Sequence, residues 1–256
     1  INLFNNNLFN NWSFKLSDYI AIPSWWVFLL AVLGSWVILG FDSKLNIKYK
    51  LKYNFGVYIR IVLGVILMLP MLLYGLIFNQ VAVGDVKIVV LDIGQGLSVV
   101  LFTNKHVWVY DTGPSYPNGF NAADAVIIPY LHTMGVHKLD GVIVSHGDND
   151  HAGGFAHLAQ NFQISQVYSS YHKLIKSHAA KKCKSGKVWW VDGVKFELYQ
   201  ASGLAKRLRS KNNLSCVLSV TGRNYKVLLP GDIESPAEYK LVRKYSHQLK
   251  SDILIA

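Results

Sequence analysis

Two long apolar runs dominate the first third of the chain. Residues 22–41 contain no charged side chain over twenty positions, and residues 61–78 contain none over eighteen. As a helix, each run is long enough to cross a hydrocarbon core of about 30 Å. Tryptophan and tyrosine lie near the ends of the runs, as they do at membrane interfaces. The pattern predicts two transmembrane helices, at about 22–41 and 61–78; the alternative is a pair of buried helices in a large soluble core.

The connector between the two runs is strongly basic. From residue 42 to residue 60 it carries five lysines and arginines against one acid, whereas residues 1–21 carry one base and one acid. Basic loops stay on the cytoplasmic side, so we expect the connector in the cytoplasm. Two crossings then return the chain to the outer side. We therefore expect the domain after residue 82 to lie outside the cytoplasm.

A different pattern begins at about residue 83, where short β-type runs alternate with helical stretches. The expected strands are 86–91, 97–102, 107–110, 141–144, 187–191, 194–199, 216–220, 225–229 and 252–256. The expected helices are 122–134, one from about 153, and one that opens with Ser235 as N-cap. Asp192-Gly193 is a strong hairpin signal. We therefore divide the chain into a membrane segment, 1–82, and an α/β domain, 83–256, built as a layered sandwich.

Composition and charge narrow the interpretation further. Hydrophobic residues make up 51% and charged residues 16%, which excludes a disordered chain and an ordinary soluble domain, so part of the chain must contact lipid. The net charge of +11 points to anionic partners, either phospholipid headgroups or nucleic acid. Two cysteines exclude a disulfide-rich scaffold and a four-thiolate metal site. Because the chain starts at Ile1 and ends in what reads as an unfinished strand, we expect an internal fragment of a longer protein, without a signal peptide at Ile1.

Candidate metal ligands gather directly after the buried strand expected at 141–144. Residues 145–151 read Ser-His-Gly-Asp-Asn-Asp-His, which puts four metal-type ligands into six positions of a loop that precedes a helix. A loop at a strand end can aim alternate side chains at one small volume, as a metal site requires. The alternative is a solvent-exposed turn whose histidines and aspartates bind nothing. The density of ligands favours the metal site.

This His-x-Asp-x-Asp-His motif resembles the His-x-His-x-Asp-His signature of the metallo-β-lactamase superfamily. The version with Asp148 in place of the second histidine, followed by Gly153-Gly154, is similar to the extracytoplasmic domain of ComEC-type competence proteins, which internalise DNA during transformation. Further motifs agree in order: Leu-Asp-Ile-Gly-Gln-Gly at 91–96, Tyr-Asp-Thr-Gly at 110–113, Asn-Asn-Leu-Ser-Cys-Val-Leu at 212–218 and Gly-Asp-Ile-Glu at 231–234. The resemblance covers residues 86–256 and implies a metallo-β-lactamase-like αββα sandwich that is truncated at its C-terminus.

The resemblance also implies a site for two divalent metal ions. Its ligands would be His146 and Asp148 for one ion, Asp150 and His151 for the other, and Asp232 as the bridge. Asp148 and Asp150 would also be the catalytic carboxylates. Three further residues would hold the ligands in place by hydrogen bonds: Asp111, Asn213 and Ser215. Because Asp148 replaces a neutral imidazole, the site is harder, and preference shifts from zinc toward manganese or magnesium.

A two-metal site of this kind would hydrolyse a phosphodiester bond. The resemblance therefore implies a multi-pass protein of the bacterial cytoplasmic (inner) membrane that takes up DNA. Its C-terminal domain would lie on the extracytoplasmic side and would bind and cut incoming DNA. Its partners would be DNA, membrane lipid, the remaining channel portion of the parent protein and other competence machinery. Asn-Asn-Leu-Ser at 212–215 replaces the usual third histidine motif, and the last motif would follow Ala256, so the ligand set is incomplete. Two alternatives stay open: a DNA-guiding domain that does not cut, and a hydrolase for a small thioester or lactam.

A basic segment with neighbouring aromatic residues is a candidate DNA-binding surface. Lysines that neutralise phosphates and rings that stack on bases are typical of single-strand binding, although a solvated loop beside core tryptophans is the alternative. The candidates are Lys181, Lys182, Lys184, Lys187, Arg207 and Arg209, near Tyr168, Tyr171, Trp189 and Trp190. Cys183 and Cys216 would face an oxidising compartment, so a disulfide between them is an alternative to two buried free thiols.

Overall fold

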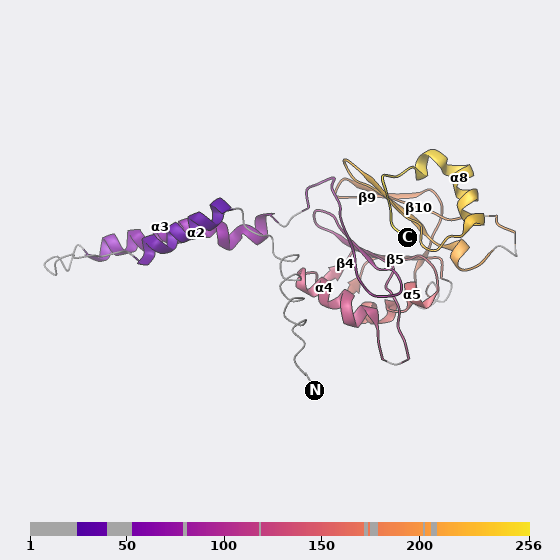
Figure 1. Cartoon of the computed structure of the whole chain (residues 1–256), viewed down its shortest axis with the longest axis horizontal. Helices are drawn as coiled ribbons and strands as arrows, with labels where there is room; N and C mark the ends of the chain where they lie inside the picture. Colours follow the sequence, from indigo (N-terminus) through magenta and orange to yellow (C-terminus); the bar gives the residue numbers. More distant parts are fainter. Residues whose placement is uncertain are drawn as a thin grey trace, which may run out of the picture. The chain divides into compact units, whose positions relative to one another are not determined.

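The chain forms two compact units, Ile1–Gln80 and Val81–Ala256. The computed structural model describes residues 25–39, 53–78, 81–117, 119–171, 174, 179–201, 203–205 and 209–256. The first unit contains helices α2 (Trp25–Leu39) and α3 (Tyr53–Phe78), and the second contains the strands and the remaining helices (Figure 1).

The two helices of the first unit cross closely at a pair of glycines. A Cβ atom on Gly34 of α2 would lie 2.6 Å from the carbonyl oxygen of Gly64 in α3, and one on Gly64 would lie 2.7 Å from that of Gly34. Beside the crossing, the Ser35 hydroxyl donates a 2.8 Å hydrogen bond to the carbonyl of Ala31. Neither glycine position has room for a side chain, so the two glycines set how closely the helices approach.

The helix bounds differ from the apolar runs. Helix α3 begins at Tyr53 rather than at residue 61, and it continues through Arg60 and Pro70. An apolar run ends where charge begins, whereas a helix continues for as long as its backbone hydrogen bonds do. Helix α2 has 15 residues, about 22 Å at 1.5 Å per residue. Among the residues that the structure describes, no helix is both long enough and apolar enough to cross a membrane, so the two predicted crossings are not shown.

The second unit is built on two large sheets. The first sheet has the order β1-β2-β3-β5-β7-β8 and the second has the order β13-β12-β11-β10-β9. The strands are β1 (Lys87–Val90), β2 (Val99–Phe102), β3 (Val107–Tyr110), β5 (Gly141–Val144), β7 (Val167–Ser169), β8 (Lys181–Lys182), β9 (Lys187–Val191), β10 (Val194–Tyr199), β11 (Val217–Thr221), β12 (Lys226–Leu229) and β13 (Ile253–Leu254). Two short strands, β4 (Lys138–Leu139) and β6 (Gln163–Ile164), pair separately. Strands β3, β5, β7 and β8 run parallel, so their carboxyl ends meet at one edge.

Helices lie on both sides of this pair of sheets. They are the π-helix η1 (Ala123–Ile127), α4 (Ile128–Thr133), α5 (Asn149–Ala152), α6 (Phe155–Asn161), the 3-10 helix η3 (Asn212–Leu214) and α8 (Ser235–Leu249). Figure 1 shows α4 and α5 on the side of β4 and β5, and α8 on the opposite side, next to β9 and β10. The layering is the αββα sandwich that the sequence predicted.

The main core fills the space between the two sheets. Trp108 of β3 is 2% exposed, and its ring centroid lies 5.3 Å from that of Trp189 and 5.6 Å from that of Phe196 in the other sheet. Aromatic contacts at such offsets add to the free energy gained by burying apolar area. A smaller core lies under α8, where Leu241 belongs to the same buried cluster as Tyr199. Aromatic packing thus joins the sheets, and α8 covers the outer face of the second one.

The hairpin predicted at Asp192-Gly193 forms, but α8 does not begin as predicted. Strands β9 and β10 pair across Asp192 and Gly193, whose positive φ angles of 49° and 81° suit a two-residue turn. Strands β11 and β12 pair in the same antiparallel manner. Ser235 is the first residue of α8 rather than its N-cap, which is Glu234. The Glu234 carboxylate accepts a hydrogen bond from Asn213 Nδ2 at 2.7 Å, a tertiary contact that local capping rules do not include.

A disulfide joins the two sheets. Cys183 follows β8 of the first sheet and Cys216 precedes β11 of the second, and their Cα atoms lie 5.8 Å apart. Both residues are buried. The sequence left a disulfide and two free thiols as alternatives, and the structure contains the disulfide.

We expect reduction of this disulfide to lower the free energy of unfolding of the second unit by about 3 to 4 kcal/mol, because the bond closes a loop over a sequence separation of 33 residues. Urea unfolding followed by tryptophan fluorescence, with and without reductant, measures the change. The Cys183→Ser/Cys216→Ser double variant serves as control, since added reductant should leave its transition unmoved. Equal midpoints for the oxidised and reduced chain would contradict the expectation.

Candidate metal centre

The candidate ligands start where two parallel strands end. Strand β5 is buried along its whole length, and its neighbour β3 pairs with it in parallel register. Ser145 and His146 therefore follow β5 at the same edge where Asp111 follows β3. The chain then enters α5, which carries Asp150 and His151. Because the carboxyl ends of parallel strands meet, residues far apart in sequence reach one small volume.

Asp111 is fully buried and holds this volume together with three hydrogen bonds. Its Oδ1 accepts the backbone N–H of Ser145 at 2.6 Å, and its Oδ2 accepts the Ser145 hydroxyl at 2.7 Å. Oδ2 also lies 2.8 Å from Nδ1 of His151, which donates to it. These bonds offset the cost of burying a carboxylate and of its left-handed backbone, φ 59°. They also turn the other ring nitrogen of His151, Nε2, toward Asp232 at 3.1 Å.

Three side chains converge in front of Asp111. Ligand atoms of His146, His151 and Asp232 all lie within 4.8 Å of one another, and the two imidazole centroids are 4.3 Å apart. Among the described residues, the buried Nε2 of His146 has no hydrogen-bond partner. It lies 3.6 Å from Oδ2 of Asp148 and 3.9 Å from Oδ2 of Asp232. An unpaired imidazole nitrogen beside carboxylates is an arrangement that a divalent cation satisfies, so these residues fit a metal ion.

The two aspartates of the motif lie on the exposed side of the cluster. Asp150 Oδ2 is 3.8 Å from His151 Nε2, and its side chain is 36% exposed. Asp148 is 35% exposed, and its Oδ1 accepts a hydrogen bond from Lys211 Nζ at 2.7 Å. Sequence reasoning missed this ion pair. Lys211 belongs to a basic run, but nothing in the sequence signals contact with an aspartate 63 positions away.

The surroundings shift the pKa values of the motif residues in different directions. Burial, together with the neighbouring His151, lowers the pKa of His146. Burial opposes a charge on His151 as well, but the hydrogen bond and the charge of Asp111 outweigh it and raise the pKa of His151 to about 9. The hydrogen bond from Lys211 lowers the pKa of Asp148. A neutral His146 beside an ionised Asp148 is the protonation state that binds a cation.

Asp232 reaches the cluster from the second sheet, just after β12. Gly231 has a positive φ of 61°, and a Cβ atom there would lie 3.0 Å from Cβ of Ser145 and 3.1 Å from Cβ of Ser215. Glycine therefore allows the loop to approach the end of β5 closely. Asn213 holds the same loop, because its side chain accepts the backbone N–H of Glu234 at 3.1 Å. Asn213, one of the residues predicted to support the ligands, thus bonds to the loop that carries Asp232. Ser215, the other, is buried beside this loop, and its hydroxyl has no hydrogen-bond partner among the described residues.

The predicted DNA-binding residues lie to one side of this cluster. Lys181 and Lys182 form β8, which aligns through β7 with Ile143 and Val144 of β5. Two strand spacings place them about 10 Å to the side of β5. Lys181 and Lys187 line a groove of about 430 Å³ together with Tyr168, Trp189 and Trp190. Lys184 is exposed, Arg209 donates from Nε to the carbonyl of Leu204 at 2.9 Å, and Arg207 lies outside the described residues.

The chain has relatives with assigned names. It is 34% identical over 172 residues to "Competence protein ComA" of Neisseria gonorrhoeae, which covers 67% of this chain and 23% of that protein. It is 32% identical over 168 residues to "Recombination protein 2" of Haemophilus influenzae, which covers 66% of this chain and 21% of that protein. The chain thus spans between a fifth and a quarter of the length of these relatives. The resemblance to ComEC-type competence proteins is confirmed.

A family model matches most of the second unit, and a solved structure shows a weaker likeness to it. A metallo-β-lactamase of Cronobacter sakazakii with a HARLDQ motif is 17% identical and aligns over 67% of this chain and 70% of its own, with a TM-score of 0.45. The family model described as "Metallo-beta-lactamase superfamily" matches residues 91–253, which include Asp111, the 146–151 motif and Asp232. The chain therefore belongs to the metallo-β-lactamase superfamily.

Proposed function

We propose that the second unit is a metal-dependent phosphodiesterase that cuts DNA within a protein of natural DNA uptake. The observation that carries this proposal is the convergence of His146, His151 and Asp232 around an unpaired imidazole nitrogen. The names of the relatives, a competence protein and a recombination protein, support DNA as the substrate. The net charge of +11 is in keeping with an anionic substrate.

The metal would be held by His146, His151 and Asp232, with Asp148 and Asp150 as further ligands on the exposed side. Manganese, zinc and magnesium are the candidates, and the carboxylate-rich set favours the harder ions. When bound, two such ions would polarise a water molecule and neutralise negative charge on the phosphate.

The chain's own residues have separate tasks in this reaction. Asp150, exposed and 3.8 Å from His151 Nε2, would accept the proton of the attacking water. The water oxygen bonds to phosphorus, the ester P–O bond breaks, and the leaving oxygen takes a proton from solvent. Asp111 fixes the ring of His151 through Nδ1. Lys211 holds Asp148 and adds positive charge at the mouth of the site, which attracts phosphate.

We further propose the setting of this domain. Residues 1–82 would form a membrane segment with helices over 22–41 and 61–78, in contact with lipid and with the rest of the parent protein's channel. The domain over 83–256 would lie on the extracytoplasmic side of the cytoplasmic membrane, where the disulfide is stable. The lysines of β8 and its flank, with Arg207 and Arg209, would contact the backbone of incoming DNA.

A second candidate function is a domain that guides DNA without cutting it. The ion pair between Lys211 and Asp148, at 2.7 Å, favours this alternative because it occupies one of the predicted ligands. Metal content and cleavage, measured together, separate the two functions.

We expect His151→Ala to abolish metal binding and to slow manganese-dependent cleavage of single-stranded DNA by at least about a hundredfold. The reason is that the change removes a buried candidate ligand at the centre of the cluster. Mass spectrometry of the purified chain measures metal, and a gel assay measures cleavage. His157→Ala is the matched control, since His157 is 44% exposed and pairs with Asp124 away from the motif. Bound metal without cleavage in the unmodified parent protein would contradict the nuclease and favour the guiding domain.

We expect Asp111→Asn to weaken metal affinity by about 10- to 100-fold, because an amide cannot accept all three of the hydrogen bonds that orient Ser145 and His151. Competition with a chelator measures the affinity. Asp124→Asn is the matched control, because Asp124 also pairs with a histidine, at 2.6 Å, but on the surface. Equal affinity in the Asp111 and Asp124 variants would show that the buried carboxylate does not position the ligands.

A further inference from the structure

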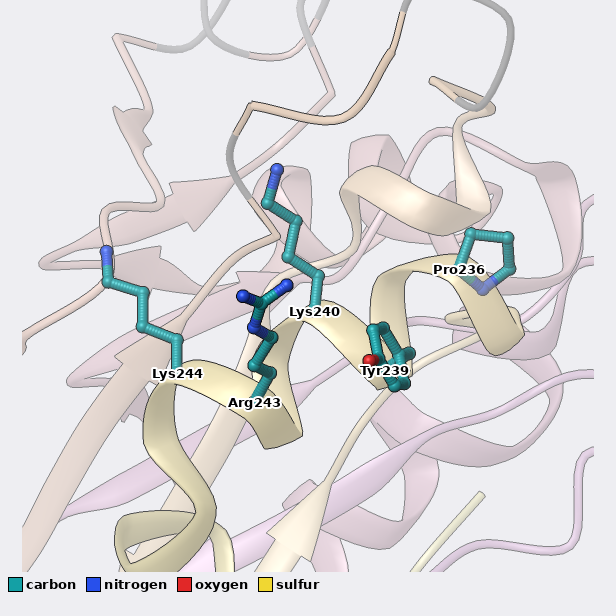
Figure 2. A pocket seen from close by; sticks show the side chains of 5 residues that line it. All are labelled: Pro236, Tyr239, Lys240, Arg243 and Lys244. Carbon is teal, nitrogen blue, oxygen red and sulfur yellow. The ribbon is translucent and has the colours of Figure 1, made fainter.

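Helix α8 carries a cationic groove that sequence inspection did not single out. The groove measures about 480 Å³ and is lined by Pro236, Tyr239, Lys240, Arg243 and Lys244. Figure 2 shows the side chains of Lys240, Arg243 and Lys244 extending to the same side of the helix. In the described part of the chain, this lining combines three cations with one aromatic ring and contains no acid.

The position of this groove in the chain ties it to the metal centre. Helix α8 begins at Ser235, three residues after Asp232, and its rise of 1.5 Å per residue places Arg243 about 12 Å along the helix axis from Ser235. The groove therefore starts beside a candidate metal ligand and leads away from it. At 100° per residue, Glu238 lies about 160° around the helix from Lys240, so the exposed acid of α8 faces away from the groove.

Hydrogen bonds also connect the groove to residues near the metal centre. Lys211 Nζ donates to Asp148 at the mouth of the site. Arg209, two residues earlier, donates to the carbonyl of Leu204 at 2.9 Å. The adjacent residue, Gly203, accepts a hydrogen bond from Lys240 Nζ on α8. Arg209 and Lys240 thus donate to carbonyls of adjacent residues, and Lys211, two positions after Arg209, pairs with a candidate metal ligand.

Tyr239 supplies a feature that a purely electrostatic surface lacks. Tyr239 is 70% exposed in the second turn of α8, although a side chain as large as that of tyrosine is usually at least partly buried. A ring exposed among cations that track a backbone is the arrangement that stacks an unpaired base. Duplex DNA does not offer its base faces, so the ring favours a single strand.

We propose that these residues form a track that holds single-stranded DNA as it passes the metal centre: Lys211, Arg209, Lys240, Arg243 and Lys244 contact phosphates, and Tyr239 stacks on a base. The track rests on the proposed function for its substrate, and it extends that function by naming the form of DNA and the path it takes. It leaves the lysines of β8 as a separate surface at the edge of the first sheet.

The test is binding of a fluorescent oligothymidylate of about 12 nucleotides to the full chain in a chelating buffer, so that cleavage plays no part. Arg243→Glu/Lys244→Glu should weaken binding by about tenfold or more, and the slope of log affinity against log salt should fall by about 1.4, since two phosphate contacts are lost. Tyr239→Ala should weaken binding by about fivefold or more without changing that slope. The Lys87→Glu/Lys138→Glu variant alters two exposed lysines elsewhere by the same charge and should bind as the unmodified chain does.

The outcomes separate the track from the proposed function. Weaker binding in both groove variants, with normal binding in the lysine control, supports the track even if no form of the chain cuts DNA. Unchanged binding in the groove variants overturns the track, even if the unmodified chain cuts DNA. If the groove variants lose binding to phosphatidylglycerol vesicles and keep oligothymidylate binding, the surface contacts lipid headgroups and the track is likewise overturned.

Discussion

The buried carboxylate of Asp111 is the constraint on which the metal centre depends. It stands at the end of β3, and its three hydrogen bonds reach Ser145 at the end of β5 and His151 in α5. A buried carboxylate without such partners would be too costly to keep, so the loop and the helix are fixed relative to the two strands. Because Nδ1 of His151 donates to Asp111, the imidazole ring is held in one orientation, and its Nε2 points into the cluster. Asp111 therefore orients the candidate ligands without being one of them.

The second sheet contributes the other half of the centre. Gly231 brings the loop with Asp232 against Ser145, and the backbone N–H of Cys216 donates to the carbonyl of Ser145 at 2.8 Å. The hydroxyl of Tyr110, on β3, reaches across to the carbonyl of Cys216 at 2.7 Å. The disulfide from Cys183 to Cys216 closes the same junction covalently. The site thus lies beside a junction where hydrogen bonds and a disulfide connect the two sheets, which limits motion of its candidate ligands.

In the proposed function, cations near the candidate metal centre would attract an anionic substrate. The motif carboxylates would attract a cation, while Lys211 at the rim pairs with Asp148 and opposes repulsion of a phosphate. The groove on α8 adds three further cations, whose side chains extend to the same side of the helix (Figure 2). A substrate with many phosphates gains from such an arrangement at every contact, whereas a small neutral substrate gains nothing.

The sequence by itself determined the parts that depend on local patterns. Short runs of β-type residues predicted nine of the strands but not β4, β6, β7 or β8. Asp192-Gly193 predicted a hairpin, and the dense motif at 146–151 provided the candidate ligands that follow β5. Only the tertiary structure decided the rest. It brings Asp111, His151 and Asp232 together and pairs Lys211 with Asp148. It also forms the disulfide and makes Glu234 the N-cap of α8. Apart from the cap, these contacts join residues 33 to 81 positions apart, and no periodicity encodes such separations. They arise because two sheets pack face to face and bring the ends of their strands together.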